Sequence, residues 1–156
     1  MRTITDIKIE GQSSAKTWAH MLVSMYINWI NKDPYKRRVE NIFDLVYHGS
    51  NDGGFIIIFT HDDPSLADRL QYEIGVHRLV RIEEDGLRQT SFAKVSINDI
   101  DLRTVSGNTR NYILDPYGLA KDPRTGYCVD DVHSVLNGDL DGFMDAYAKR
   151  MKGSYE

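Results

Sequence analysis

One stretch of this sequence places large apolar side chains on a single helical face. Its apolar residues recur three or four positions apart over most of its length, at Trp18, Leu22, Met25, Tyr26 and Trp29. This spacing predicts an amphipathic helix, because residues three and four apart lie on the same side of a helix. The motif Asn-Lys-Asp-Pro ends the pattern. The apolar face must be buried, and we expect it to pack on a sheet.

Strand patterns flank this helix on both sides. Alternating polar and apolar residues predict a half-buried strand over residues 3–9, which ends at Gly11. After the helix, two strands over 39–47 and 55–60 enclose a loop rich in Gly, Asn and Asp over 48–54, and this arrangement predicts a hairpin. The second strand of the hairpin is strongly apolar, and we expect it in the interior of the sheet.

The rest of the chain continues the mixture of strands and helices. In chain order we expect a helix from about residue 62 to Ile74 with Gly75 as its C′ residue, a basic extended segment, a charged turn over 83–86, strands over 90–97 and 112–114, an irregular loop over 115–126, and helices over 131–136 and 140–151. A hydrophobic content of 41% in 156 residues suffices for one sizeable core. We therefore predict a single α+β domain over 1–156. It is expected to be a two-layer sandwich of a mixed, mainly antiparallel sheet with packed helices.

The charge balance excludes a strongly basic protein. The chain has 19 Lys and Arg residues against 23 Asp and Glu residues, so any RNA contact must be a local patch. The single cysteine, Cys128, excludes an internal disulfide and is typical of a reducing compartment, so we expect a cytoplasmic protein. The longest apolar run, over 55–59, is too short to cross a bilayer, and the first residues carry no secretory signal.

Candidate catalytic and metal-binding residues are few. Cys128 and His133 offer a thiol nucleophile and a base, but no third group orients them, so we expect a core thiol near a surface histidine. His77 is expected to serve in packing or hydrogen bonding. The five histidines lack the spacing of metal ligands. We therefore predict no catalytic residue, no metal, no cofactor and no small-molecule substrate.

Two blocks of sequence resemble a known family. The first block contains the helix over 18–29, the run Gly-Val-His-Arg-Leu-Val-Arg at 75–81 and the tripeptide Thr-Ser-Phe at 90–92. The second block extends from Arg110 to Met151 and includes the motif Arg-Asn-Tyr-Ile-Leu-Asp. Together they resemble the stop-codon-decoding body of bacterial class I peptide chain release factors, of the type that reads UGA and UAA. The resemblance implies one core made of residues 1–103 and 108–152, joined by a short bridge.

Several parts of the family's machinery have no counterpart in this sequence. No Gly-Gly-Gln occurs, and this motif carries the family's hydrolytic chemistry, so the resemblance implies that the protein is not an enzyme. The family's N-terminal helical domain is not expected either, and its Ser-Pro-Phe type decoding tripeptide is replaced by a short acidic interval. Ser14 stands where the family has a glutamate, and Gln89 where it has a codon-stacking histidine. Only Thr90 matches a decoding position.

The retained body predicts binding to RNA, because RNA is held by cations on phosphates and by planar groups that stack on bases. The candidate RNA-binding residues are Ser13, Ser14, Lys36, Arg37, Arg38, Arg78, Arg81, Arg88, Gln89 and Thr90. For each cluster the alternative is a solvated surface with ordinary ion pairs. The acidic turn at 83–85 argues against RNA binding unless it points away or pairs with neighbouring arginines.

Three functions follow from the resemblance. The first is a non-catalytic RNA-binding protein that holds mRNA or ribosomal RNA and influences translation or transcript fate. The second is a decoy in the ribosomal A site that competes with true release factors. The third is a protein–protein scaffold that has kept only the fold. A domain-stripped copy of a housekeeping factor is the kind of gene that phages carry, and a phage origin is a hypothesis.

Overall fold

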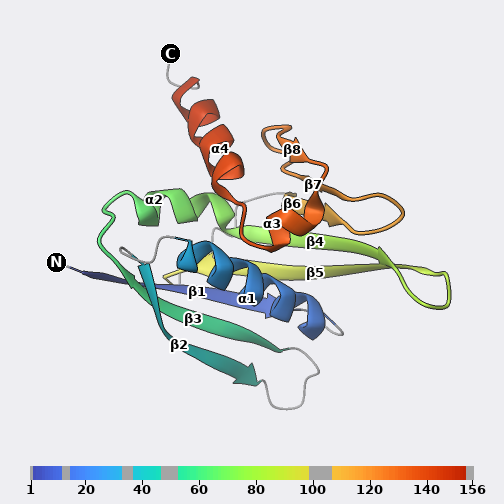
Figure 1. Ribbon diagram of the computed structural model, residues 1–156, viewed down its shortest axis with the longest axis horizontal. Coiled ribbons are helices and arrows are strands. Elements are labelled where there is room, and N and C mark those ends of the chain that lie inside the picture. The colour runs from blue at the N-terminus through green and yellow to red at the C-terminus, as the bar shows by residue number, and fades with distance from the viewer. Residues whose placement is uncertain (1, 12–14, 33–36, 47–52, 99–106, 154–156) are drawn as a thin grey trace.

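The computed structural model describes residues 2–11, 15–32, 37–46, 53–98 and 107–153, in which eight strands form one sheet (Figure 1). The elements in chain order are β1 (Thr3–Gly11), α1 (Lys16–Asn31), β2 (Arg37–Val46), β3 (Gly53–His61), α2 (Leu66–Leu70), the 3-10 helix η1 (Gln71–Glu73), β4 (Gly75–Ile82), β5 (Arg88–Ile97), β6 (Asn108–Ile113), β7 (Leu119–Lys121), β8 (Cys128–Val129), α3 (Val132–Leu136) and α4 (Asp141–Gly153).

The strand order across the sheet is β2-β3-β1-β5-β4-β6-β7-β8. Every neighbouring pair is antiparallel except β4 and β6, which run parallel. The prediction of a mixed, mainly antiparallel sheet with packed helices is therefore confirmed. β3 lies between β1 and β2, which confirms its expected interior position.

Strand β3 begins earlier than the sequence predicted. Gly54, assigned above to the loop, pairs with Glu10 inside the sheet. A Cβ atom at this position would lie 2.1 Å from the carbonyl oxygen of Ile9, so the absence of a side chain lets β1 approach closely. Gly53, also assigned to the loop, is the first residue of β3, and residues 48–52 lie outside the described residues.

Helix α1 packs on one face of the sheet, as its apolar spacing predicts. Trp18, Tyr26 and Trp29 are each at most 1% exposed, and they join a single hydrophobic cluster with buried residues of both sequence blocks. The indole N–H of Trp18 donates to the carbonyl of His77 at 3.0 Å, which fixes the helix over β4. The residue at the N-cap position is Ala15, which makes no side-chain capping bond. Ser13 and Ser14, which precede it, lie outside the described residues.

The helix expected from about residue 62 is shorter than predicted. The carboxylate of Asp63 accepts hydrogen bonds from the backbone N–H and the hydroxyl of Ser65 at 2.9 and 2.7 Å. This local turn competes with helical hydrogen bonding, so α2 begins only at Leu66. The chain then continues as the 3-10 helix η1 and becomes extended at Ile74. Gly75, with a φ of 130°, follows as the first residue of β4.

The segment 115–126 is not wholly irregular, contrary to the prediction. Its residues 119–121 form β7, which pairs with β6 through Tyr112 and Ala120. The backbone N–H of Asp122 donates to the carbonyl of Tyr127 at 3.0 Å, and Gly126 turns the chain with a φ of 81°. β8 then pairs with β7 as the last strand of the sheet. Strands of two or three residues are too short to give a periodic signal.

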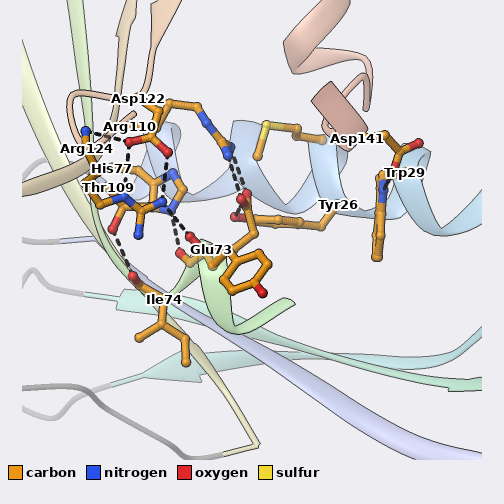
Figure 2. A network of polar contacts seen from close by, with 12 residues as sticks. Tyr26, Trp29, Glu73, Ile74, His77, Thr109, Arg110, Asp122, Arg124 and Asp141 are labelled. Carbon is orange, nitrogen blue, oxygen red and sulfur yellow. Dashed lines mark hydrogen bonds and ion pairs between the residues drawn. The ribbon is translucent and has the colours of Figure 1, made fainter. Parts of the chain in front are cut away.

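A buried polar network joins the two sequence blocks (Figure 2). Arg110 of β6 donates two hydrogen bonds to the carboxylate of Glu73 in η1, at 2.5 and 2.8 Å, and both side chains are at most 1% exposed. Tyr26 of α1 donates to the same carboxylate at 3.1 Å, while Arg110 also donates to the hydroxyl of Tyr112 at 2.9 Å. Burial opposes the charge on Glu73, but the charge and hydrogen bonds of Arg110 outweigh it and hold the pKa of Glu73 below its usual value.

His77 completes this network. One ring nitrogen lies 2.8 Å from the carbonyl oxygen of Glu73, and the other lies 3.0 Å from the hydroxyl of Tyr112. Since a carbonyl only accepts, the neutral ring donates from Nε2 and receives the tyrosine hydroxyl at Nδ1. Burial and the nearby charge of Arg110 lower the pKa of His77 to about 4. The expected role of His77 in packing and hydrogen bonding is confirmed.

Candidate functional site

The candidate site lies on the β4–β5 hairpin, which carries five of the predicted RNA-binding residues. The two strands pair from Gly75 opposite Val95 to Ile82 opposite Arg88. The turn between them is tight, since the backbone N–H of Glu83 donates to Leu87 at 2.9 Å. Its end projects from the body at the right of Figure 1. The hairpin therefore presents side chains that no helix covers at its tip.

The hairpin divides these five residues between its two faces. Directly paired residues on neighbouring strands point to the same side, and successive residues alternate. Arg81 is paired with Gln89 on the side of the sheet that carries α1. Arg78, Arg88 and Thr90 occupy the opposite register and lie on the open side. The sequence alone groups the five together, because the segment 75–82 has no alternating apolar pattern that would divide them between two faces.

On the helix side of the hairpin, the acidic turn engages an arginine. The guanidinium Nε of Arg81 lies 2.9 Å from a carboxylate oxygen of Glu83. The same guanidinium reaches the amide oxygen of Gln89 at 3.5 Å. Asp85 accepts a hydrogen bond from the backbone N–H of Leu87 at 2.9 Å and so helps to shape the turn. Arg81 therefore neutralises part of the acidic turn that argued against an RNA site.

The open side of the hairpin is cationic. We call the five residues Arg78, Arg88, Thr90, Phe92 and Lys94 the open-face patch. No acidic residue occupies this side of β4 or β5. The side chains of Arg78 and Arg88 form no hydrogen bond or ion pair with any residue that the structure describes. Such unneutralised guanidinium groups retain all their donors for a ligand.

Sequence reasoning missed two members of this patch. Phe92 is 40% exposed and directly opposite Arg78, whereas the sequence marks it only as part of the motif Thr-Ser-Phe. Lys94 lies opposite Val76 on the same side. The missed signal is the strand period of two over 90–97, where Ala93, Val95 and Ile97 are buried and the residues between them face the other way.

The second predicted cluster lies far from the hairpin. Arg37 and Arg38 are the first two residues of β2. Arg37 pairs with His61 of β3, and His61 also pairs with Thr3 at the start of β1, so the cluster lies at this end of the sheet. Measured along the strand direction, Arg37 and Arg88 are separated by thirteen residues, or roughly 40 Å. The predicted residues Lys36, Ser13 and Ser14 lie outside the described parts of the chain.

This second cluster is partly occupied by local contacts. The guanidinium of Arg37 lies 4.0 Å from the ring centre of Trp29 and donates to its carbonyl at 3.2 Å. Arg38 lies 4.0 Å from Glu40. With Arg2 they line an open hollow of about 780 Å³. This cluster therefore belongs to a different surface from the open-face patch.

The structure gives little support for chemistry at cysteine or histidine. Cys128 is exposed, so the prediction of a core thiol is wrong. It lies on the two-residue strand β8, which is next to β7 and is the last strand of the sheet in the described part of the chain. Within the described ranges, no three His, Cys, Asp or Glu residues are placed to hold a metal ion. The helices that the structure describes include none long and apolar enough to span a membrane.

Comparison with known proteins identifies the family. The family model of the PCRF domain matches residues 8–95, which is more than half of the chain and runs from β1 to β5. The chain belongs to the PCRF-domain family. It is similar to peptide chain release factor 2 of Rhodococcus erythropolis, with 27% identity, and of Mycolicibacterium smegmatis, with 29% identity; each match covers 87% of this chain and 61% of the relative.

The fold agrees with this relationship. RF2 of Thermus thermophilus superimposes with a TM-score of 0.72 over 96% of this chain and 69% of that chain, at 18% sequence identity. The expected resemblance to type 2 release factors is thus confirmed, and this PCRF-domain protein has a release-factor-derived core. The chain spans about three-fifths of the length of the curated relatives. The alignment to the Rhodococcus relative is 227 residues long, so at least 71 of its positions have no counterpart among these 156 residues.

Proposed function

We propose that this PCRF-domain protein binds RNA without catalysing a reaction, and that it holds mRNA or ribosomal RNA to influence translation or transcript fate. The observation that supports this most is the open-face patch. Two guanidinium groups without protein partners lie on a projecting hairpin, on a side of its strands that carries no acid. Since the whole chain has a net charge of −4, such a local patch is where phosphate would be attracted.

The proposal excludes peptide release, because the sequence contains no Gly-Gly-Gln. In the described structure the hydroxyl of Thr5 lies 2.8 Å from Nε2 of His61, but both side chains are buried and Nδ1 of His61 has no partner to orient the ring. Binding itself is the proposed activity, in the cytoplasm and with no cofactor or small-molecule substrate. A scaffold that binds only protein is the competing proposal, and it predicts no dependence on Arg78 or Arg88.

A salt series tests the proposal. Binding of short single-stranded RNA is measured by fluorescence anisotropy across a range of salt concentrations. Each phosphate contact contributes about −0.7 to the slope of log affinity against log salt, so two or three contacts give a slope of roughly −1.4 to −2.1. Arg78→Gln and Arg88→Gln should each weaken binding and make the slope shallower by about 0.7.

Arg38→Gln is the matched control. It removes the same charge from an exposed arginine at the other end of the sheet, and it should leave both affinity and slope unchanged. Undetectable binding by the wild-type protein at low salt contradicts the RNA proposal. A loss of affinity in Arg38→Gln with none in the two hairpin variants places the contact elsewhere and contradicts the assignment to the patch.

A ribosomal decoy is a second candidate, favoured by the match to release factor 2 over 87% of this chain. In this case the hairpin would enter the decoding site and exclude a true release factor. Co-sedimentation with ribosomes and a slower termination rate in a reconstituted translation reaction support the decoy. Binding to free RNA with no effect on termination contradicts it.

A further inference from the structure

We infer that the open-face patch takes single-stranded RNA, with one base stacked on Phe92. This inference rests on the proposed RNA binding and names the form of RNA and the residue that selects it. The ring of Phe92 lies on the side of the sheet opposite α1 and is 40% exposed. An aromatic ring presented on a sheet is a surface on which any unpaired base can stack.

The residues beside Phe92 supply the other contacts that a nucleotide needs. Arg78 lies directly opposite Phe92 on β4, and Asn111 lies opposite Arg78 on β6. These three residues form one row across three neighbouring strands, combining a ring, a cation and an amide. The Oδ1 of Asn111 accepts from the amide of Asn108 at 2.8 Å, which leaves its NH₂ group to donate to the edge of a stacked base, while the guanidinium of Arg78 can reach the phosphate.

The cations continue along the direction of the strands. Lys94 lies two residues from the row of Phe92, roughly 7 Å away, and Arg88 lies four residues away in the other direction, roughly 13 Å. A chain of phosphates that follows β5 would therefore meet positive charge on both sides of the stacked base. Toward β1 the patch ends at Glu10, which pairs with Lys94 in register and lies 3.6 Å from Lys8. Because the carboxylate of Glu10 would repel phosphate, the RNA is expected to follow β5 and to cross toward β4 and β6, away from β1.

The arrangement favours a single strand over a duplex. Bases in an RNA duplex are stacked on each other, and their faces are not available to a side chain. A ring on a sheet surface can contribute only if a base is splayed out to meet it. A protein partner is favoured less, because Arg78 and Arg88 have no acidic neighbour on β4, β5 or β6 in the described structure, whereas Lys94 lies opposite Glu10 of β1.

The test replaces the ring and keeps the charge. Phe92→Leu should weaken binding of short single-stranded RNA by roughly fivefold or more, since base–aromatic stacking contributes on this scale. The salt slope should stay unchanged, because no cation is removed. Phe92→Tyr, which retains a ring, should bind as the wild type does. Phe43→Leu is the matched control, since Phe43 is 46% exposed on the same side of the sheet but on β2.

A second readout reports stacking directly. RNA that carries the fluorescent base aminopurine at successive positions should be quenched at one position by the wild-type protein and by Phe92→Tyr. The quenching should be absent with Phe92→Leu. Thermal melting of each variant confirms folding, and Phe92→Leu should melt close to the wild type because its side chain is partly in solvent.

The outcomes separate this inference from the proposed function. If the wild type binds no RNA at low salt, the proposed function fails and this inference fails with it. If the wild type binds and Phe92→Leu binds equally well with the same quenching, the stacking inference is overturned while RNA binding stands. Equal affinity for a duplex of the same sequence also overturns the inference.

Discussion

Replacing Glu73 with glutamine should destabilise the protein strongly. The change keeps the size of the side chain but removes the charge that neutralises Arg110, and the guanidinium of Arg110 is fully buried. Breaking a buried ion pair by removing one partner costs about 3–5 kcal/mol, because the other charge remains out of water. For a protein of this size, each kcal/mol lowers Tm by about 2–4 °C, so Tm should fall by roughly 6–20 °C.

The assay is urea denaturation followed by circular dichroism at neutral pH. Glu40→Gln is the control, because Glu40 is exposed and lies 4.0 Å from Arg38, so its loss should cost under about 1 kcal/mol. The double change Glu73→Leu with Arg110→Met removes both charges and should recover much of the loss, since apolar replacements of a buried pair are often neutral. A cost for Glu73→Gln no larger than that for Glu40→Gln would refute the argument that this pair holds the two sequence blocks together.

Two further predictions concern the pH dependence and the packing of α1. The pKa of His77 falls from 6.5 to about 4 in the folded protein, so between these pH values the unfolded chain binds this proton and the folded protein does not. The contribution of His77 to the free energy of unfolding is therefore complete above pH 6.5, and it falls by about 1.4 kcal/mol per pH unit as the pH drops toward 4. His77→Gln should therefore flatten the stability profile over this window, and an unchanged slope contradicts the assignment. Gly138→Ala should cost on the order of 2 kcal/mol or more in urea denaturation, since Gly138 has a φ of 103° and its Cβ would lie 2.6 Å from the backbone nitrogen of Trp29. Gly126→Ala isolates the backbone strain, because its φ is 81° in open space, and an equal cost for both changes would show that the contact with α1 is unimportant.

The strongest periodic signals in the sequence predicted the fold well. The spacing from Trp18 to Trp29 predicted both α1 and its position on the sheet, and the apolar run at 55–59 predicted an interior strand. Both segments are long enough for their burial to appear in the sequence as a regular pattern of apolar residues. β7 and β8 could not be predicted this way, because strands of three and two residues are too short to show a periodic pattern and form only when the turn between them brings them together.

The site was predicted less completely than the fold. Arg110 and Glu73 gave no sign of burial in the sequence, since charged residues are ordinarily exposed and their pairing joins segments 37 residues apart. Arg78 and Arg88 were identified, but their shared side with Phe92 depends on the register of β4 against β5. Register is fixed by the whole sheet, and a single basic segment does not reveal it.

The parallel placement of β6 beside β4 also makes the protein easy to extend. Ile97 ends β5 and Asn108 begins β6 at the same end of the sheet, opposite to the hairpin turn. A reporter domain grafted between these strands would thus emerge at the end of the sheet opposite the hairpin turn, close to Lys94 but far from Arg88. Such a chimaera could be imaged or immobilised while the projecting tip of the hairpin stays unobstructed.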